Sequence, residues 1–150
     1  FCFEAFLPTD KKEKRKILEE LKYDTRTLIL YEAPHRLKKT LNELLEELGD
    51  RTITIVKELT KKHENVWKTS ISEAVNIYSE QEPRGEYVLI IEGKSYEEMD
   101  RENKSQWESI SIEDHVSLYM KQGLDKKSAM KAVAKDRGLS KREIYQSMLK

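Results

Sequence analysis

The chain has 150 residues, enough for one ordinary domain or a small domain with an appendage. Lys and Arg together number 28, as do Asp and Glu, so the net charge is zero, which excludes a uniformly basic surface but not a local basic patch. No apolar run is long enough to span a bilayer. The single cysteine, Cys2, excludes an internal disulfide and a cysteine metal cluster, and it suits a reducing, cytoplasmic setting.

Apolar segments rich in β-branched and aromatic residues alternate with segments of helical periodicity over the first part of the chain. The expected strands are residues 1–7, 27–31, 52–56, 65–69 and 85–91. The expected helices between them are residues 11–22, 34–48 and 70–79. We predict an α/β fold with a mixed sheet and flanking helices, in which residues 1–7 form a buried strand and residues 85–91 a central one.

The composition changes along the chain and indicates three parts. We assign residues 1–94 to the α/β domain and residues 95–110 to an acidic, partly helical linker. Residues 111–150 carry nine bases and five acids and show no strand pattern, so we expect a basic tail of three short helices. Their expected N-caps are Ser111, Asp125 and Ser140. Because the chain opens directly on an apolar strand without Met, we expect it to be part of a longer protein.

A first candidate site lies at residues 31–36, directly after an expected strand. Ligands of open α/β sheets lie beyond the carboxyl ends of strands, and small Ala33 would let a ligand approach the backbone. Pro34 suits the first turn of the following helix. The alternative is an ordinary strand–helix turn with solvated charges.

Two further segments concentrate polar groups at strand ends. Residues 57–64 follow a strand and contain Glu and Lys side chains that could accept a proton or bind phosphate. Residues 85–87 enter the central strand, and Gly85 allows an unusual backbone angle or a close approach. The alternatives are an exposed charged loop and a simple turn. The three histidines have no spacing suited to a metal, so we expect no metal site.

Residues 134–145 partly match a helix-turn-helix pattern, with Gly138 four residues after Ala134. Several lysines lie nearby, so contact with nucleic-acid phosphate is one interpretation. A small three-helix packing module with an ordinary basic face is the other.

Three segments together resemble one family. Residues 27–37 (TLILYEAPHRL) are the most specific, followed by residues 57–64 (KELTKKHE) and 85–93 (GEYVLIIEG). The run Phe6-Leu7-Pro8 ahead of a lysine-rich helix also fits. They resemble the carboxyl-terminal half of the ribosomal RNA small-subunit methyltransferase I family, within the tetrapyrrole methylase superfamily.

The resemblance covers residues 1–94 and, more loosely, residues 111–150. It implies a two-domain enzyme that uses S-adenosylmethionine to methylate the ribose 2′-hydroxyl of a cytidine in small-subunit ribosomal RNA. A missing N-terminal domain would carry the Gly-rich cofactor loop, so this chain is expected to be inactive by itself. The implied partners are small-subunit ribosomal RNA, that N-terminal domain and a second copy in a homodimer, with no membrane partner.

The resemblance also implies contacts with S-adenosylmethionine, mostly through the backbone. The matching positions are Tyr31, Glu32, Ala33, Lys57, Gly85, Glu86 and Tyr87. Methyl transfer to a hydroxyl benefits from a base, and our candidate catalytic residue is Glu58. The candidates for RNA binding are Arg36, Lys61, Lys126, Lys127, Lys141 and Arg142.

Two other interpretations keep the same fold. The substrate could be a tetrapyrrole, such as a corrin or porphyrin precursor, but a basic helical tail would then serve no purpose. Alternatively, the chain could be a non-catalytic module for nucleic-acid binding or dimerisation.

Overall fold

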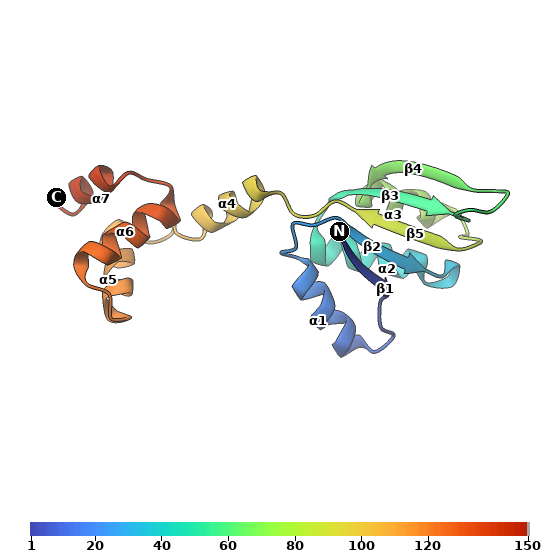
Figure 1. Ribbon diagram of the computed structural model, residues 1–150, viewed down its shortest axis with the longest axis horizontal. Helices are drawn as coiled ribbons and strands as arrows, with labels where there is room; N and C mark the ends of the chain where they lie inside the picture. Colours follow the sequence, from blue (N-terminus) through green and yellow to red (C-terminus); the bar gives the residue numbers. More distant parts are fainter. Residues whose placement is uncertain (150) are drawn as a thin grey trace. The chain divides into compact units, whose positions relative to one another are not determined.

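The computed structural model describes residues 1–149, which form two compact units. Phe1–Ser95 is an α/β unit, and the second unit, which begins at Tyr96, is all-helical (Figure 1). The predicted fold class, a mixed sheet with flanking helices followed by a helical tail, is confirmed. Among the described residues, no helix combines the length and the apolar character needed to cross a membrane.

A five-stranded sheet, in the order β1-β2-β5-β3-β4, organises the α/β unit. Its strands are β1 (Cys2–Phe6), β2 (Leu28–Glu32), β3 (Thr52–Lys57), β4 (Asn65–Ser70) and β5 (Tyr87–Ile91). The β1–β2 pair is parallel, because a helical crossover joins these strands, and the β3–β4 pair is antiparallel, because only a short loop joins them. The apolar segment 87–91 is the central strand, as predicted.

The position of β5 decides which chain segments meet at one edge of the sheet. β5 pairs antiparallel with β2 on one side and with β3 on the other, so β2 and β3 run in the same direction. In this register Tyr87 is opposite both Glu32 and Lys57. The carboxyl ends of β2 and β3 therefore lie beside the start of β5, although these segments are far apart in the sequence.

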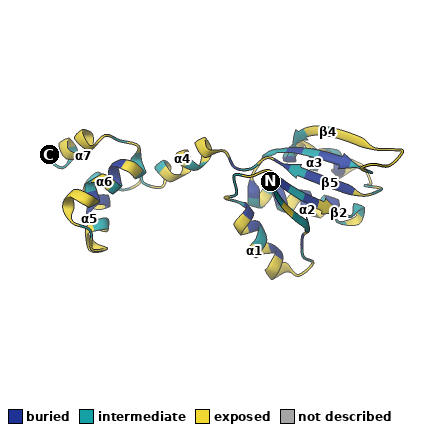
Figure 2. Ribbon diagram, in the orientation of Figure 1, coloured by how far each residue is buried: buried dark blue, intermediate teal, exposed yellow. Residues whose placement is uncertain are grey.

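Three helices cover one face of the sheet. They are α1 (Lys11–Leu21), α2 (Pro34–Leu48) and α3 (Ile71–Glu80), and Figure 1 shows α2 and α3 behind the strands. Alternate strand residues such as Leu30, Ile55 and Leu89 join the helices in one apolar core. Figure 2 shows this core as the buried stretches of β2, β3 and β5, whereas the outer strand β4 is largely exposed.

Strand β1 differs from its prediction as a buried strand. It is an edge strand, and Phe1, Phe3 and Phe6 are 82%, 49% and 54% exposed. Ala5, at a φ of +52°, and a shift of register between Phe3 and Ala5 mark a bulge. Among residues 1–7, only Leu7 is buried. The apolar and aromatic composition predicted burial for the whole segment, because composition does not show which face of the sheet the helices cover.

The helical unit contains α4 (Tyr96–Ser105), α5 (Ile112–Lys121), α6 (Lys126–Arg137) and α7 (Lys141–Ser147). Helix α4 lies within the segment expected to be an acidic linker. Helices α5–α7 pack around a small core of Val116, Ala129, Val133, Ala134 and Ile144. The three predicted N-caps, Ser111, Asp125 and Ser140, each accept backbone hydrogen bonds at the starts of these helices.

Candidate functional site

A hollow of about 640 Å³ lies at the edge of the sheet where β2 ends and β5 begins. Phe6 from β1, residues 31–35, Leu59 and Thr60 from the loop after β3, and residues 86–88 line it. Its walls are largely apolar, and the rings of Phe6 and Tyr31 meet edge to face with centroids 5.8 Å apart. The structure thus brings together segments of all three motifs that the sequence singled out.

Five of the seven predicted cofactor contacts line this hollow: Tyr31, Glu32, Ala33, Glu86 and Tyr87. Lys57 and Gly85 are not among the described lining residues, although Lys57 is opposite Tyr87 in the sheet register. Phe6, Leu59, Thr60 and Val88 line the hollow too but were not selected from the sequence. The sequence indicated these residues only as members of the motif segments. Which residue of a segment faces the hollow depends on how the strands pair.

The Glu32 carboxylate shapes the turn between β2 and α2 rather than facing solvent. Glu32 is 2% exposed, and its Oε1 accepts a hydrogen bond from the Ala33 backbone N–H at 2.8 Å. Its Oε2 accepts a hydrogen bond from Thr40 Oγ1 at 2.5 Å. A buried carboxylate needs such partners, so Glu32 holds Ala33 at the floor of the hollow and ties the turn to α2.

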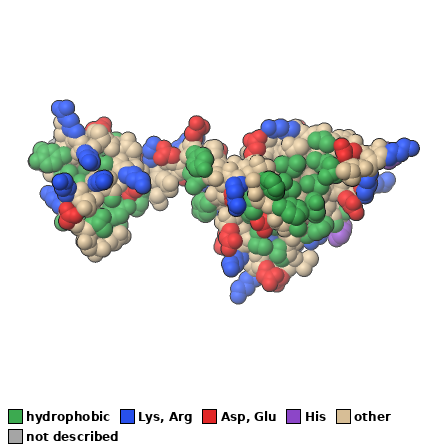
Figure 3. Space-filling view, viewed as in Figure 1, with side chains coloured by type: hydrophobic (Ala, Val, Ile, Leu, Met, Phe, Trp, Pro, Cys, Tyr) green, Lys and Arg blue, Asp and Glu red, His purple; other side chains and the backbone are tan. Residues whose placement is uncertain are grey.

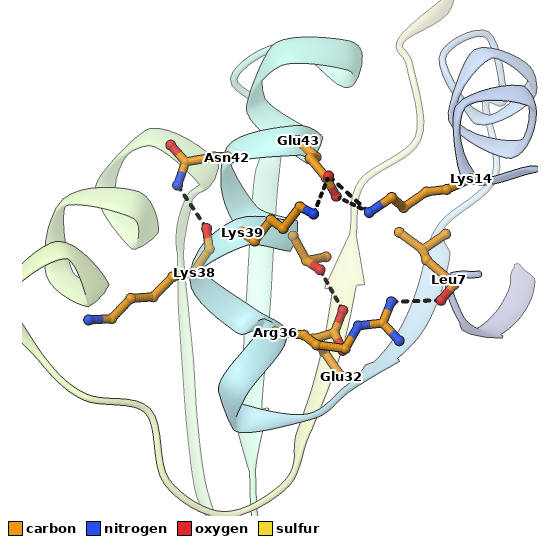
Figure 4. Close-up of polar contacts among 9 residues, drawn as sticks. Leu7, Lys14, Glu32, Arg36, Lys38, Lys39, Asn42 and Glu43 are labelled. Carbon is orange, nitrogen blue, oxygen red and sulfur yellow. Dashed lines mark hydrogen bonds and ion pairs between the residues drawn. The ribbon is translucent and has the colours of Figure 1, made fainter. Parts of the chain in front are cut away.

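Arg36 completes this arrangement, as Figure 4 shows. Its Nε lies 3.4 Å from Glu32 Oε1, and its Nη2 donates a hydrogen bond to the Leu7 carbonyl at 2.7 Å. The guanidinium thereby neutralises Glu32 and joins the β2–α2 turn to the end of the β1 segment. These contacts give Arg36 a positioning role, and its assignment to RNA binding stays a prediction.

Glu58 connects the loop after β3 to the start of β5. Its backbone N–H donates to the Glu86 carbonyl at 2.9 Å, and its Oε1 accepts from the Glu86 N–H at 2.7 Å. That hydrogen bond, assisted by Lys61 and Lys57, holds the pKa of the Glu58 carboxyl below its usual range. A lowered pKa makes the carboxylate a weaker proton acceptor, so its described contacts are those of a positioning residue; its role as the base stays a prediction.

Gly85 and Lys61 both depend on the Glu58 side chain. A Cβ at Gly85, whose φ is +85°, would lie 2.5 Å from Glu58 Oε1. Lys61 Nζ is 2.9 Å from Glu86 Oε2 and 3.4 Å from Glu58 Oε1, and these carboxylates raise its pKa. Gly85 is therefore required by close packing, and Lys61, predicted to bind RNA, is engaged with two carboxylates.

The other four predicted RNA-binding residues lie together in the helical unit. Lys126, Lys127, Lys141 and Arg142 line a second hollow, on α6 and α7, with Met130, Lys131 and Tyr145. Lys131 is one of the lysines that the sequence placed near the helix-turn-helix pattern. Tyr145 was not selected, because only the packing of α7 against α6 shows that it shares their surface. Within residues 1–149, no group of three or more His, Cys, Asp or Glu side chains is placed to hold a metal ion.

A mixed five-stranded sheet with a mostly apolar hollow at its strand ends gives the chain the architecture of an α/β protein with a candidate small-molecule site. Residues 1–75 match the family of tetrapyrrole (corrin/porphyrin) methylases, and the chain belongs to this family. Members of the family use S-adenosylmethionine as the methyl donor. This match confirms the resemblance inferred from the three motifs.

Relatives with a more specific name match most of the chain. A protein named ribosomal RNA small subunit methyltransferase I from Bacillus subtilis (strain 168) is 46% identical over 145 residues, which cover 97% of this chain and 49% of that protein. The protein of the same name from Halalkalibacterium halodurans is also 46% identical, covering 97% of this chain and 50% of its own length. The one from Thermotoga maritima is 38% identical over 94 residues, 63% of this chain and 42% of that protein.

The chain therefore spans about half the length of the curated relatives that it matches. The names of these relatives agree with the resemblance to ribosomal RNA methyltransferases.

Proposed function

We propose that this chain forms part of an enzyme that transfers a methyl group from S-adenosylmethionine to a ribose 2′-hydroxyl of cytidine in small-subunit ribosomal RNA. In this proposal the α/β unit of residues 1–94 is a carboxyl-terminal domain, residues 95–110 connect it to the basic helical tail of residues 111–150, and an N-terminal domain completes the cofactor cleft. In this proposal the enzyme acts in the cytoplasm, where it meets ribosomal RNA. We also propose that the enzyme is a homodimer, as the family resemblance implies, and that the chain alone is inactive.

The observation that carries the proposal is the convergence of three motifs on one hollow. Glu32, Tyr87 and Lys57 are in register across β2, β5 and β3, so the segments that resemble the family's cofactor-binding positions meet at one edge of the sheet. Relatives named as small-subunit ribosomal RNA methyltransferases, at 46% identity, support RNA rather than a tetrapyrrole as the substrate. Family membership likewise argues against a purely structural or dimerisation module.

The residues at this edge fit one side of a nucleoside-sized cofactor. A volume of about 640 Å³ lies within the range of small-molecule sites, and apolar walls suit an adenine ring. Residues 31–33 and 86–88 would hold the adenosine, mainly with their backbone and apolar atoms. When bound, S-adenosylmethionine supplies a methyl group that is already activated by its positively charged sulfur.

The remaining tasks are alignment of the ribose oxygen and removal of its proton. Glu32 and Arg36 keep the β2–α2 turn rigid, and Glu58 keeps the loop after β3 joined to β5, so the walls of the hollow are positioned before binding. Glu58 Oε2 accepts no hydrogen bond from another described residue, which leaves one oxygen for our candidate base. Replacing Glu58 with Gln should then lower the turnover number and shift its pH profile; unchanged turnover would remove Glu58 from the mechanism.

The test is methylation of intact small ribosomal subunits by the whole protein, using labelled S-adenosylmethionine. Mass spectrometry of the digested RNA should locate the new methyl group on a cytidine ribose. Methylation of a base, or of an added tetrapyrrole instead of RNA, would contradict the proposal.

A pair of leucine variants tests whether the hollow is the cofactor site. Ala33→Leu fills part of the hollow and should weaken binding of S-adenosylmethionine about fivefold or more, because overpacking costs about 1–3 kcal/mol. Asn76→Leu places the same side chain on the exposed face of α3 and should bind like the unmodified protein. Equal affinities of the two variants would place the cofactor elsewhere.

A further inference from the structure

We propose that the hollow on α6 and α7 is an RNA-binding site that takes an unpaired nucleotide stretch, with its phosphates on the basic rim and one base on Tyr145. This inference rests on the proposed function, because the RNA is the proposed substrate. It deepens that function by naming the RNA structure that the helical unit recognises.

The first argument is the concentration of cations around one concave surface. The hollow has a volume of about 680 Å³ and carries five cationic side chains from two helices: Lys126, Lys127, Lys131, Lys141 and Arg142. Figure 3 shows several Lys and Arg side chains on the visible face of the helical unit. A chain with zero net charge thus gathers positive charge where two helices meet, as a phosphate-binding surface requires.

The second argument is that these cations are not compensated within the protein. None of the five forms an ion pair with another described residue. The nearest acids in sequence, Asp125 and Glu143, are used by the main chain. Asp125 Oδ2 accepts from the Lys127 N–H at 3.2 Å, and Glu143 Oε2 accepts from the Ser140 N–H at 2.7 Å. The lysine and arginine side chains therefore present their full charge to an anionic ligand.

The third argument is the apolar surface between the cations. Tyr145 is 57% exposed although it is aromatic, and half-buried Met130 lies beside it in the hollow. An exposed ring among cations provides a stacking surface for a base, and a phosphate-binding rim supports it. The hollow is therefore better suited to a nucleotide than to a small anion such as phosphate.

An unpaired stretch fits this surface better than a duplex. Only unpaired bases expose their faces for stacking, and the major groove of duplex RNA is too deep and narrow for a helix to enter. Tyr145 is the fifth of the seven residues of α7, so it is one helical turn after Lys141 and Arg142. Its ring is therefore presented beside these two cations rather than at the tip of a long recognition helix.

The experiment measures the affinity of the whole protein for a short unstructured RNA and for a perfect RNA duplex as the salt concentration rises. The paired substitution Lys127→Gln with Arg142→Gln should reduce the slope of log K against log[salt] by about 1.4, since each single-strand phosphate contact contributes about 0.7. Tyr145→Leu should weaken binding of the unstructured RNA about fivefold or more, with little change of slope.

A matched pair of cations serves as the control. Lys121 and Lys135 are exposed in the same unit but do not line the hollow, so replacing both with Gln should leave the slope nearly unchanged. An equal loss of slope in both pairs would show only general attraction and would overturn the proposal. Tighter binding of the duplex, or no effect of Tyr145→Leu, would also overturn it.

Failure of this inference is distinguishable from failure of the proposed function. If the protein methylates ribosomal RNA but the hollow variants bind like the unmodified protein, the site is wrong and the activity stands. If the hollow variants lose RNA binding but the protein methylates no RNA, the site stands and the proposed reaction is wrong.

Discussion

Substitution of Gly85 by Ala should destabilise the α/β unit for two separable reasons. The φ of Gly85 is +85°, a backbone conformation that side chains disfavour. The new Cβ would also lie 2.5 Å from Glu58 Oε1 and 2.9 Å from its Cδ. The Glu58 carboxylate would have to move away, which would break its hydrogen bond with the Glu86 N–H.

The backbone contribution sets a lower limit for the effect. Holding a non-glycine residue in such a conformation costs about 1–3 kcal/mol. For a unit of this size, a loss of 1 kcal/mol lowers Tm by about 4–8 °C, so Gly85→Ala should lower the Tm of the α/β unit by at least about 4 °C. Displacement of Glu58 adds to that loss.

A double-mutant cycle separates the two contributions. Glu58→Ala removes all three of the atoms that the new Cβ would approach most closely, so it should make Gly85→Ala less costly without relieving the backbone strain. The control is Gly49→Ala, because Gly49 also has a positive φ, +80°, but nothing lies within 4 Å of its added Cβ. Its cost should be the same with and without Glu58. Urea unfolding, with hydrogen exchange of β3 and β5 amides, measures the stability of this unit.

Two results would refute the reasoning. An unchanged stability of Gly85→Ala would show that the backbone adopts another conformation at this position. A cost of Gly85→Ala that is identical with and without Glu58 would show that the close approach to the carboxylate has no energetic consequence.

Three further variants test the positions of buried and capping groups. Thr40→Val keeps the side-chain shape but leaves Glu32 Oε2 without its buried donor, which should cost about 1–3 kcal/mol of stability, measured by urea unfolding. Ser140→Ala removes the N-cap of α7 and should cost about 0.5–2 kcal/mol in the helical unit, measured by hydrogen exchange of its amides. The pKa of fully buried His115 is lowered from its ordinary value of 6.5 by burial and then by Arg137, whose Nε donates to His115 Nδ1 at 3.2 Å. Because the unfolded state binds the proton more readily, the stability of the helical unit should be complete above about pH 6.5 and decline as the pH falls, and His115→Gln should abolish this dependence.

Local patterns in the sequence were sufficient to predict most of the elements. Pro34 begins α2, and the three caps of the tail helices lie where the side-chain pattern indicated. These features depend on neighbours within three or four residues, so they can be inferred without knowledge of the fold. The continuous apolar run of β5 indicated its central position, which the strand order confirms. Its residues alternate between buried and half-buried, because helices cover only one face of the sheet.

The orientation of the site's side chains could not be inferred in this way. The sequence assigned Glu32 to the cofactor and Arg36 to RNA, with solvated charges of a strand–helix turn as the alternative. The structure instead pairs Glu32 with Thr40, and Arg36 with Leu7, which is 29 residues away. Glu58 meets Glu86 across 28 residues, and Gly85 is required because that carboxylate passes beside it. Such contacts depend on strand order, which short-range spacing does not encode.

Sequence alone established the order of the elements, the family resemblance and the segments in which the chemistry should lie, because periodicity, capping and motif composition are properties of neighbouring residues. Tertiary structure decided that β5 inserts antiparallel between β2 and β3 and so brings three distant segments to one hollow. It also decided which face of β1 stays open and that Tyr145 joins the cations of α6 and α7. The physical reason is that all three outcomes follow from the free energy of packing whole elements against one another, and no single segment determines that free energy.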